Sequence, residues 1–296
     1  MRNRMWGPIT ATAAIVILSF AQTAIDGQTS APGATVVSLP RASDGHPDFH
    51  GIWNAVVGGS FSIEDLTLQT EAADFQGQAT SQSERTERRT VRSRIVDPAD
   101  GKIPYQPWAR AKQQEIFAGR DNPTSEFLDP RSRCFLNGVP RFMHLGAFQI
   151  VQTPGLILML FEDNHAFRTI PLDGRPRLGQ DIQLWRADSR GQWEGDSLVI
   201  DVTNVSDQPR FDVVGNFHSD ALHVVERLRL VDADTIDYRA TMDDPKVYTR
   251  PWTMAIVIRR VKEKGFELLE SACHEGNRDL EQLLRNDANG TGRDNK

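Results

Sequence analysis

The feature that most constrains the fold is a series of short apolar runs, separated by turn residues at near-regular spacing, that begins at Phe142 and continues to Cys273. Such a series is typical of antiparallel strands joined by tight connections. Counting a first strand around Trp53, the sequence predicts about nine strands. The apolar runs after Phe142 that could supply these strands lie at 148–153, 156–162, 165–172, 182–185, 198–202, 222–231, 235–242, 252–261 and 266–273.

A sheet of this size needs its faces covered and its edges protected. One helix is predicted, from Pro107 to Gly119, and it cannot cover both faces. Closure of an antiparallel meander into a barrel removes the exposed edges, and about eight strands enclose packed side chains or one small ligand. The sequence therefore predicts a mostly β, lipocalin-like barrel with a helical and loop insertion at 60–140. A β-sandwich remains the alternative.

The amino-terminal residues indicate export. Arg2 and Arg4 precede a short apolar run at 9–20, and Ala21 ends a small-residue cleavage site. We expect a signal peptide at 1–21, a flexible leader at 22–45, a single barrel domain at 46–285 and a disordered tail at 286–296. The mature protein is then periplasmic or extracellular.

Charge and hydropathy limit the partners. A net charge of −6 gives no general attraction to nucleic acid. The apolar run at 9–20 is shorter than the roughly 20 residues that a membrane-spanning helix needs, and no later segment is apolar enough to span a bilayer. We expect neither nucleic-acid binding nor stable membrane insertion.

Two cysteines, Cys134 and Cys273, are the only ones in the chain. An oxidising compartment favours a disulfide between them. Two free thiols, or a thiol that acts as a ligand beside His274, are the alternatives.

The strand at 222–231 places one charge on an apolar face. Alternate residues put Glu226 on the same face as Leu222, Val224, Leu228 and Leu230. A buried carboxylate is costly unless it is paired, hydrogen-bonded or protonated, so Glu226 is either a structural ion-pair partner or a site residue.

The neighbouring strands extend this inward face and suggest a site for a small apolar or aromatic molecule. Trp53, Tyr238, Trp252 and Met254 are the expected walls. Three polar side chains are expected to orient one end of the ligand: Arg141, Glu226 and Tyr248. His165 is a further candidate contact. A filled core without a cavity is the alternative, because cores use the same residue types.

An acid–base enzyme (isomerase, lyase or hydrolase) is the second hypothesis, with Glu226 as the base. The acid would come from His223 or His144, or else from His165 or His274. No zinc motif, nucleophile elbow, phosphate loop or dinucleotide fingerprint is present, so the sequence predicts no metal and no cofactor. A scaffold protein without a cavity is a third possibility.

Several stretches together resemble a large group of exported proteins of soil and marine bacteria. They are found at 148–155, 168–176, 190–199, 244–253 and 272–277, with 47–53 as the start. The resemblance assigns no catalytic residue. Gly51-Ile52-Trp53 on the first predicted strand also resembles the Gly-x-Trp of lipocalin-like barrels, which favours a barrel over a sandwich.

Overall fold

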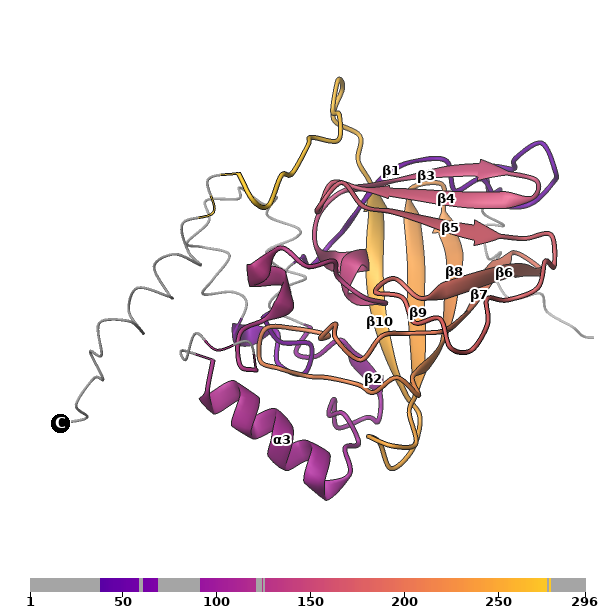
Figure 1. The fold of residues 1–296 in the computed structure, drawn as a ribbon. Helices are drawn as coiled ribbons and strands as arrows, with labels where there is room; N and C mark the ends of the chain where they lie inside the picture. Colours follow the sequence, from indigo (N-terminus) through magenta and orange to yellow (C-terminus); the bar gives the residue numbers. More distant parts are fainter. Residues whose placement is uncertain are drawn as a thin grey trace, which may run out of the picture. The chain divides into compact units, whose positions relative to one another are not determined.

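The strands form an antiparallel sheet that curls until it is nearly closed into a barrel, as the meander pattern predicts (Figure 1). The computed structural model describes residues 38–58, 61–68, 91–120, 124, 126–275 and 277. The expected signal peptide, the leader up to residue 37 and the tail at 286–296 lie outside these described residues.

The strands of the main sheet share one path, in the order β5-β4-β3-β1-β10-β9-β8-β7-β6, and each neighbouring pair is antiparallel. Their bounds are β1 Gly51–Ala55, β3 Phe148–Thr153, β4 Leu156–Phe161, β5 Phe167–Pro171, β6 Asp188–Glu194, β7 Ser197–Thr203, β8 His223–Asp232, β9 Thr235–Asp243 and β10 Trp252–Arg260. A short strand outside this path, β2 (Ile95–Asp97), also pairs with β10.

The two end strands, β5 and β6, face each other across a junction that we call the seam. Across it, Arg168 Nε donates a hydrogen bond to Ser189 Oγ at 3.0 Å. A β-carbon at Gly191 would lie 2.5 Å from Leu172 Cδ2 and 2.8 Å from Ile170 Cγ2. The missing side chain of Gly191 therefore allows the two edges to approach.

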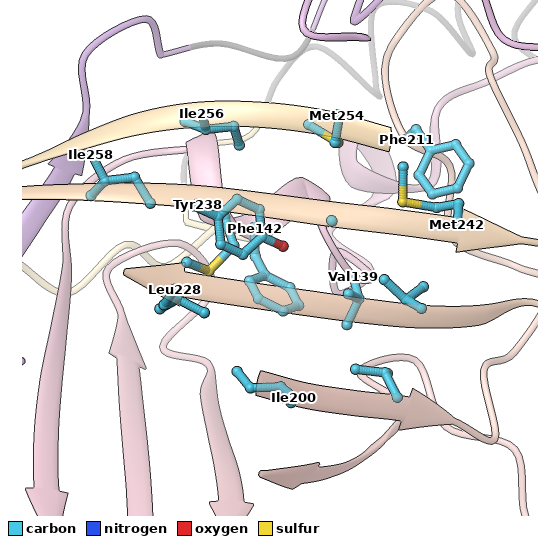
Figure 2. Close-up of a cluster of buried hydrophobic side chains, with 14 of the residues drawn as sticks. Val139, Phe142, Ile200, Phe211, Leu228, Tyr238, Met242, Met254, Ile256 and Ile258 are labelled. Atoms are coloured by element: carbon cyan, nitrogen blue, oxygen red, sulfur yellow. The ribbon is translucent and has the colours of Figure 1, made fainter. Parts of the chain in front are cut away.

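The alternation predicted for 222–231 is correct. Leu222, Val224, Glu226, Leu228 and Leu230 are all buried. They join one continuous core with the inward residues of β9 and β10, part of which Figure 2 shows. The period of two along each strand is enough to set this face, because the other side of the sheet meets water.

Two predicted strands are wrong. Residues 182–185 make only one isolated bridge, between Leu184 and Val205, and 266–273 make only one, between Ser271 and Asp163. The strand that pairs with β7 is instead β6, which lies between the predicted strands at 182–185 and 198–202. Its sequence is mostly polar, so pairing with β7 defines it better than its hydropathy does.

The insertion contains more order than the sequence predicts. Helix α3 (Pro107–Ala118) confirms the expected helix, and its buried face includes Gln113 and Ile116. Gln113 Nε2 donates to the carbonyl of Val214 at 2.8 Å, which attaches the helix to the loop before β8. The described part of the insertion before this helix also contains strand β2, where Ile95 is buried. Two short 3₁₀ helices follow, η1 (Pro130–Arg133) and η2 (Arg141–His144).

Order also begins earlier than residue 46, where the expected barrel domain starts. Arg41 pairs with Asp196 in the turn after β6, and His46 stacks on Trp193 with ring centroids 4.5 Å apart. The pairing of Arg41 fixes a residue that the composition alone assigns to the flexible leader at 22–45.

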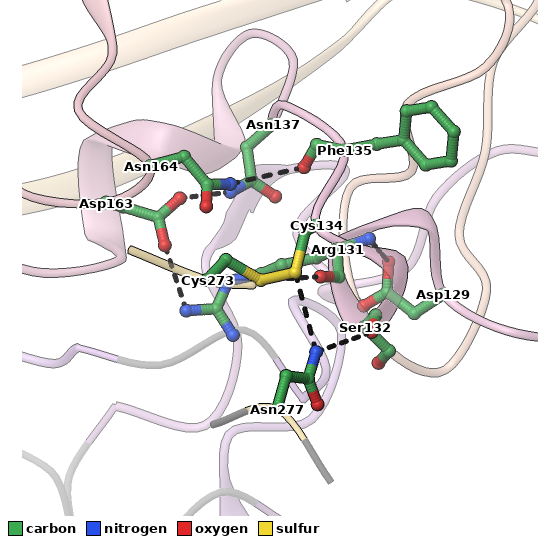
Figure 3. Close-up of a disulfide and its surroundings, with 10 residues drawn as sticks. All are labelled: Asp129, Arg131, Ser132, Cys134, Phe135, Asn137, Asp163, Asn164, Cys273 and Asn277. Atoms are coloured by element: carbon green, nitrogen blue, oxygen red, sulfur yellow. Dashed lines mark hydrogen bonds and ion pairs between the residues drawn. A yellow bond between two sulfur atoms is a disulfide. The ribbon is translucent and has the colours of Figure 1, made fainter. Parts of the chain in front are cut away.

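Cys134 and Cys273 form a disulfide, as predicted, with Cα atoms 5.5 Å apart (Figure 3). Nearby, Asn277 Nδ2 donates to the carbonyl of Ser132 at 3.5 Å. The disulfide thus ties the segment that follows β10 to the end of η1. Among the described residues, no helix is long and apolar enough to span a membrane.

Candidate functional site

Glu226 lies inside the barrel and is fully paired. Arg168 of β5 donates from Nη1 to Oε1 at 3.1 Å and from Nη2 to Oε2. Tyr238 of β9 donates its hydroxyl to Oε1 at 2.6 Å. Arg168 also bonds Ser189 of β6, so one network joins both sides of the seam to the strands opposite.

The network keeps Tyr238 protonated. Burial, followed by the neighbouring Glu226 carboxylate, raises the pKa of Tyr238 well above its ordinary value. The neutral phenol of Tyr238 is therefore available as a hydrogen-bond donor to the carboxylate of Glu226, the one charged group on the inward face of β8.

Sequence reasoning missed Arg168, the main partner of Glu226. Its neighbours Phe167 and Thr169 are exposed, whereas Arg168 and Ile170 are buried. Alternation along 166–170 therefore placed Arg168 on the inward face. The pattern was available but contained no indication that this arginine would meet Glu226.

The four predicted walls of a ligand pocket belong to the core. Trp53, Tyr238, Trp252 and Met254 each have 0% of their surface exposed. A side chain beside a water-sized space, open or enclosed, would retain accessible surface. Figure 2 shows Tyr238 and Met254 among other apolar side chains of the interior. These four residues pack against protein on all sides.

Arg141, expected to orient a ligand, makes a buried ion pair instead. Its guanidinium donates to both carboxylate oxygens of Asp129, at 2.9 and 2.5 Å, and to the carbonyl of Arg210. Burial alone would raise the pKa of Asp129, but the charge of Arg141 lowers it below its ordinary value. Arg141 therefore joins η2 to the start of η1.

The candidate histidines do not meet Glu226. His223 lies on the outer face of β8, half-exposed, with Nε2 3.2 Å from Asp201. His144 is buried in η2. His165 is exposed in the turn before β5, 3.8 Å from Glu270. Within the described part of the chain, Glu226 has no histidine among its hydrogen-bond partners.

A second buried polar network lies in the loop before β8. Asp212 accepts hydrogen bonds from the backbone N–H of Asn216 at 2.9 Å and from its side chain at 2.6 Å. Tyr105 donates to Asn216, and Tyr248, a predicted ligand contact, donates to the carbonyl of Phe217. The pKa of Asp212 is raised to about 6, because burial raises it more than the hydrogen bonds from Asn216 lower it.

Arg186, just before β6, has a guanidinium with no hydrogen-bond acceptor. All three of its nitrogens are shielded from solvent and unbonded in the described structure. The guanidinium carbon lies 4.9 Å from the ring centre of Phe142 and 4.8 Å from that of Phe161. Burial, and next the charge of Arg168, lower the pKa of Arg186 to about 10. No motif in the sequence marked this residue.

Beside Arg186 two segments expose large apolar side chains. Phe135 and Trp185 stack with ring centroids 5.0 Å apart and an angle of 2°. Phe135 is 43% exposed, and Leu136 and Leu184 are each 37% exposed. We call Phe135, Leu136, Leu184 and Trp185 the seam patch. Figure 3 shows Phe135 one residue from the disulfide.

No set of three or more metal-ligating side chains gathers among the residues that the structure describes. No protein-family model and no curated protein matches the chain. The function must therefore be argued from the geometry of the seam and the interior.

Proposed function

We propose that the chain binds a small apolar or aromatic molecule, and that the molecule is held at the seam patch. The observation that supports this proposal is the stacked Phe135–Trp185 pair, in which Phe135 is exposed and Trp185 is partly exposed. Adjacent large apolar side chains on a protein surface are typical of interaction sites. The fully buried walls that the sequence favoured offer no comparable surface.

The interior favours binding over acid–base catalysis. A general base must reach its proton, but the hydrogen bonds from Arg168 and Tyr238 occupy the Glu226 carboxylate. Its bidentate partner suits an ion pair that stabilises the barrel. We therefore assign Glu226 a structural role and place the ligand elsewhere.

We also infer that the protein acts outside the cytoplasm. The apolar run near the amino terminus supports this, and the Cys134–Cys273 disulfide is compatible with an oxidising compartment. Mass spectrometry of the exported protein should find a mature chain that begins at Gln22. An intact Met1 would contradict export by cleavage.

The binding proposal is tested with phenylnaphthylamine, a neutral fluorescent probe whose emission rises in apolar surroundings. We expect saturable binding to the mature chain. Phe135→Ser should weaken it about fivefold or more, because the probe loses its stacking surface. Phe167→Ser is the matched control, since Phe167 is 62% exposed on the outside of β5. No saturable binding, or equal weakening by both substitutions, would refute the proposal.

A further inference from the structure

We propose that the ligand of the seam patch carries a carboxylate and that Arg186 binds it. This inference rests on the proposed function, because the seam patch would hold the apolar body of the same molecule. It assigns the ligand to the class of aromatic or apolar carboxylic acids.

The first argument is the hydrogen-bonding state of Arg186. A guanidinium has five N–H donors in its own plane, and aromatic rings interact with it mainly through their faces. Phe142 and Phe161 therefore stabilise the charge without accepting its hydrogen bonds. In the described structure all three nitrogens remain without an acceptor and without solvent. Burying N–H donors without acceptors costs free energy of folding unless a bound group supplies the acceptors.

The second argument is the charge around Arg186. Arg168, the cation whose charge lowers the pKa of Arg186, already has its own counter-ion in Glu226. The attractive charge is Asp163, but its oxygens accept hydrogen bonds from Arg131 and Asn137. The position therefore has an excess of positive charge, and an anion would neutralise it.

The third argument is the position of Arg186 in the molecule. The residue as a whole is partly exposed, whereas its guanidinium nitrogens are covered by protein, so a carboxylate reaches them by displacing the side chains that cover them. It follows directly after Trp185 of the seam patch in the chain. A planar carboxylate matches the two-pronged donor geometry of arginine, and an attached aromatic group would meet the stacked rings.

Naphthoate and its neutral amide separate this inference from the proposed function, because they differ only in the charged group. Isothermal titration of the full mature chain at neutral pH should show naphthoate binding about tenfold or more tightly than the amide, as a charge-assisted hydrogen bond would give. Arg186→Met should remove the preference and leave the affinity for the amide unchanged.

Two further variants keep the test decisive. Arg186→Lys retains the positive charge but not the planar, two-pronged donor geometry of arginine. The preference for naphthoate over the amide should therefore fall by about threefold or more. This variant keeps the test available even if Arg186→Met does not fold. Arg177→Met removes an arginine that pairs with Asp201 on the surface, and it should leave the preference intact.

The outcomes distinguish the two proposals. Binding of neither molecule would overturn the proposed function, and the carboxylate inference with it. Equal binding of both would overturn the carboxylate inference alone. A preference for naphthoate that survives both Arg186→Met and Arg186→Lys would show that another group recognises the anion, and would likewise overturn it.

Discussion

Replacing Glu226 by glutamine tests whether the barrel depends on the neutralisation of Arg168 by Glu226. Glutamine keeps the shape of the side chain but turns an NH₂ group toward the donors of Arg168. Glu226 is 0% and Arg168 is 3% exposed, so the remaining guanidinium would be a buried, unneutralised charge. Breaking a buried pair on one side costs about 3–5 kcal/mol. Because globular proteins are stable by only about 5–15 kcal/mol, this is a large fraction of the total.

Urea unfolding of the wild-type protein and the variant measures this loss. With a slope of about 3 kcal/mol per molar urea, the midpoint should fall by about 1–1.7 M. Arg168→Met should cost a similar amount. The double variant Arg168→Met/Glu226→Met should cost clearly less than the sum of the two single changes at these positions, because no charge remains buried.

Glu194→Gln provides the control, since Glu194 pairs with Arg227 on the exposed outer face. Its midpoint should match that of the wild type. If Glu226→Gln shifts the midpoint no further than Glu194→Gln does, the interior pair is not a stabilising element and our assignment of Glu226 fails. Loss of phenylnaphthylamine binding without loss of stability would instead assign Glu226 to the ligand site.

Three other changes probe the fold. Cys134→Ser opens a disulfide whose cysteines are 139 residues apart, and chain entropy predicts a loss of about 5 kcal/mol, to be measured by urea unfolding. Gly191→Val should cost about 1–3 kcal/mol in the same assay, because Leu172 already lies against the position of its β-carbon; an unchanged midpoint would show that the seam is loose. The pKa of Asp212 is raised from 3.8 to about 6, so the stability that this carboxyl contributes is complete below pH 4 and is lost as the pH rises to about 6. The difference in unfolding free energy between wild type and Asp212→Asn should therefore fall by about 3 kcal/mol from pH 3 to pH 7, and a constant difference would contradict the assignment.

The sequence by itself determined the elements whose signal is local. Alternation fixed the inward faces of β8, β9 and β10, including Glu226, because a one-residue shift would turn every side chain to the other side. Pro107 and the spacing after it located helix α3. The disulfide followed from the count of cysteines and the expected compartment.

Only the tertiary structure decided which residues meet across the barrel. Glu226 and Arg168 are 58 positions apart, and they become partners only when the sheet curls until β5 reaches β6. Strand β6 escaped prediction for the same reason, since its polar residues are ordered by their neighbour and not by an apolar pattern. Arg186 is unmarked in the sequence because its lack of an acceptor depends on the surrounding fold. The periodicity along a strand determines on which side of the sheet a side chain lies. Closure of the sheet determines which other residues that side chain contacts.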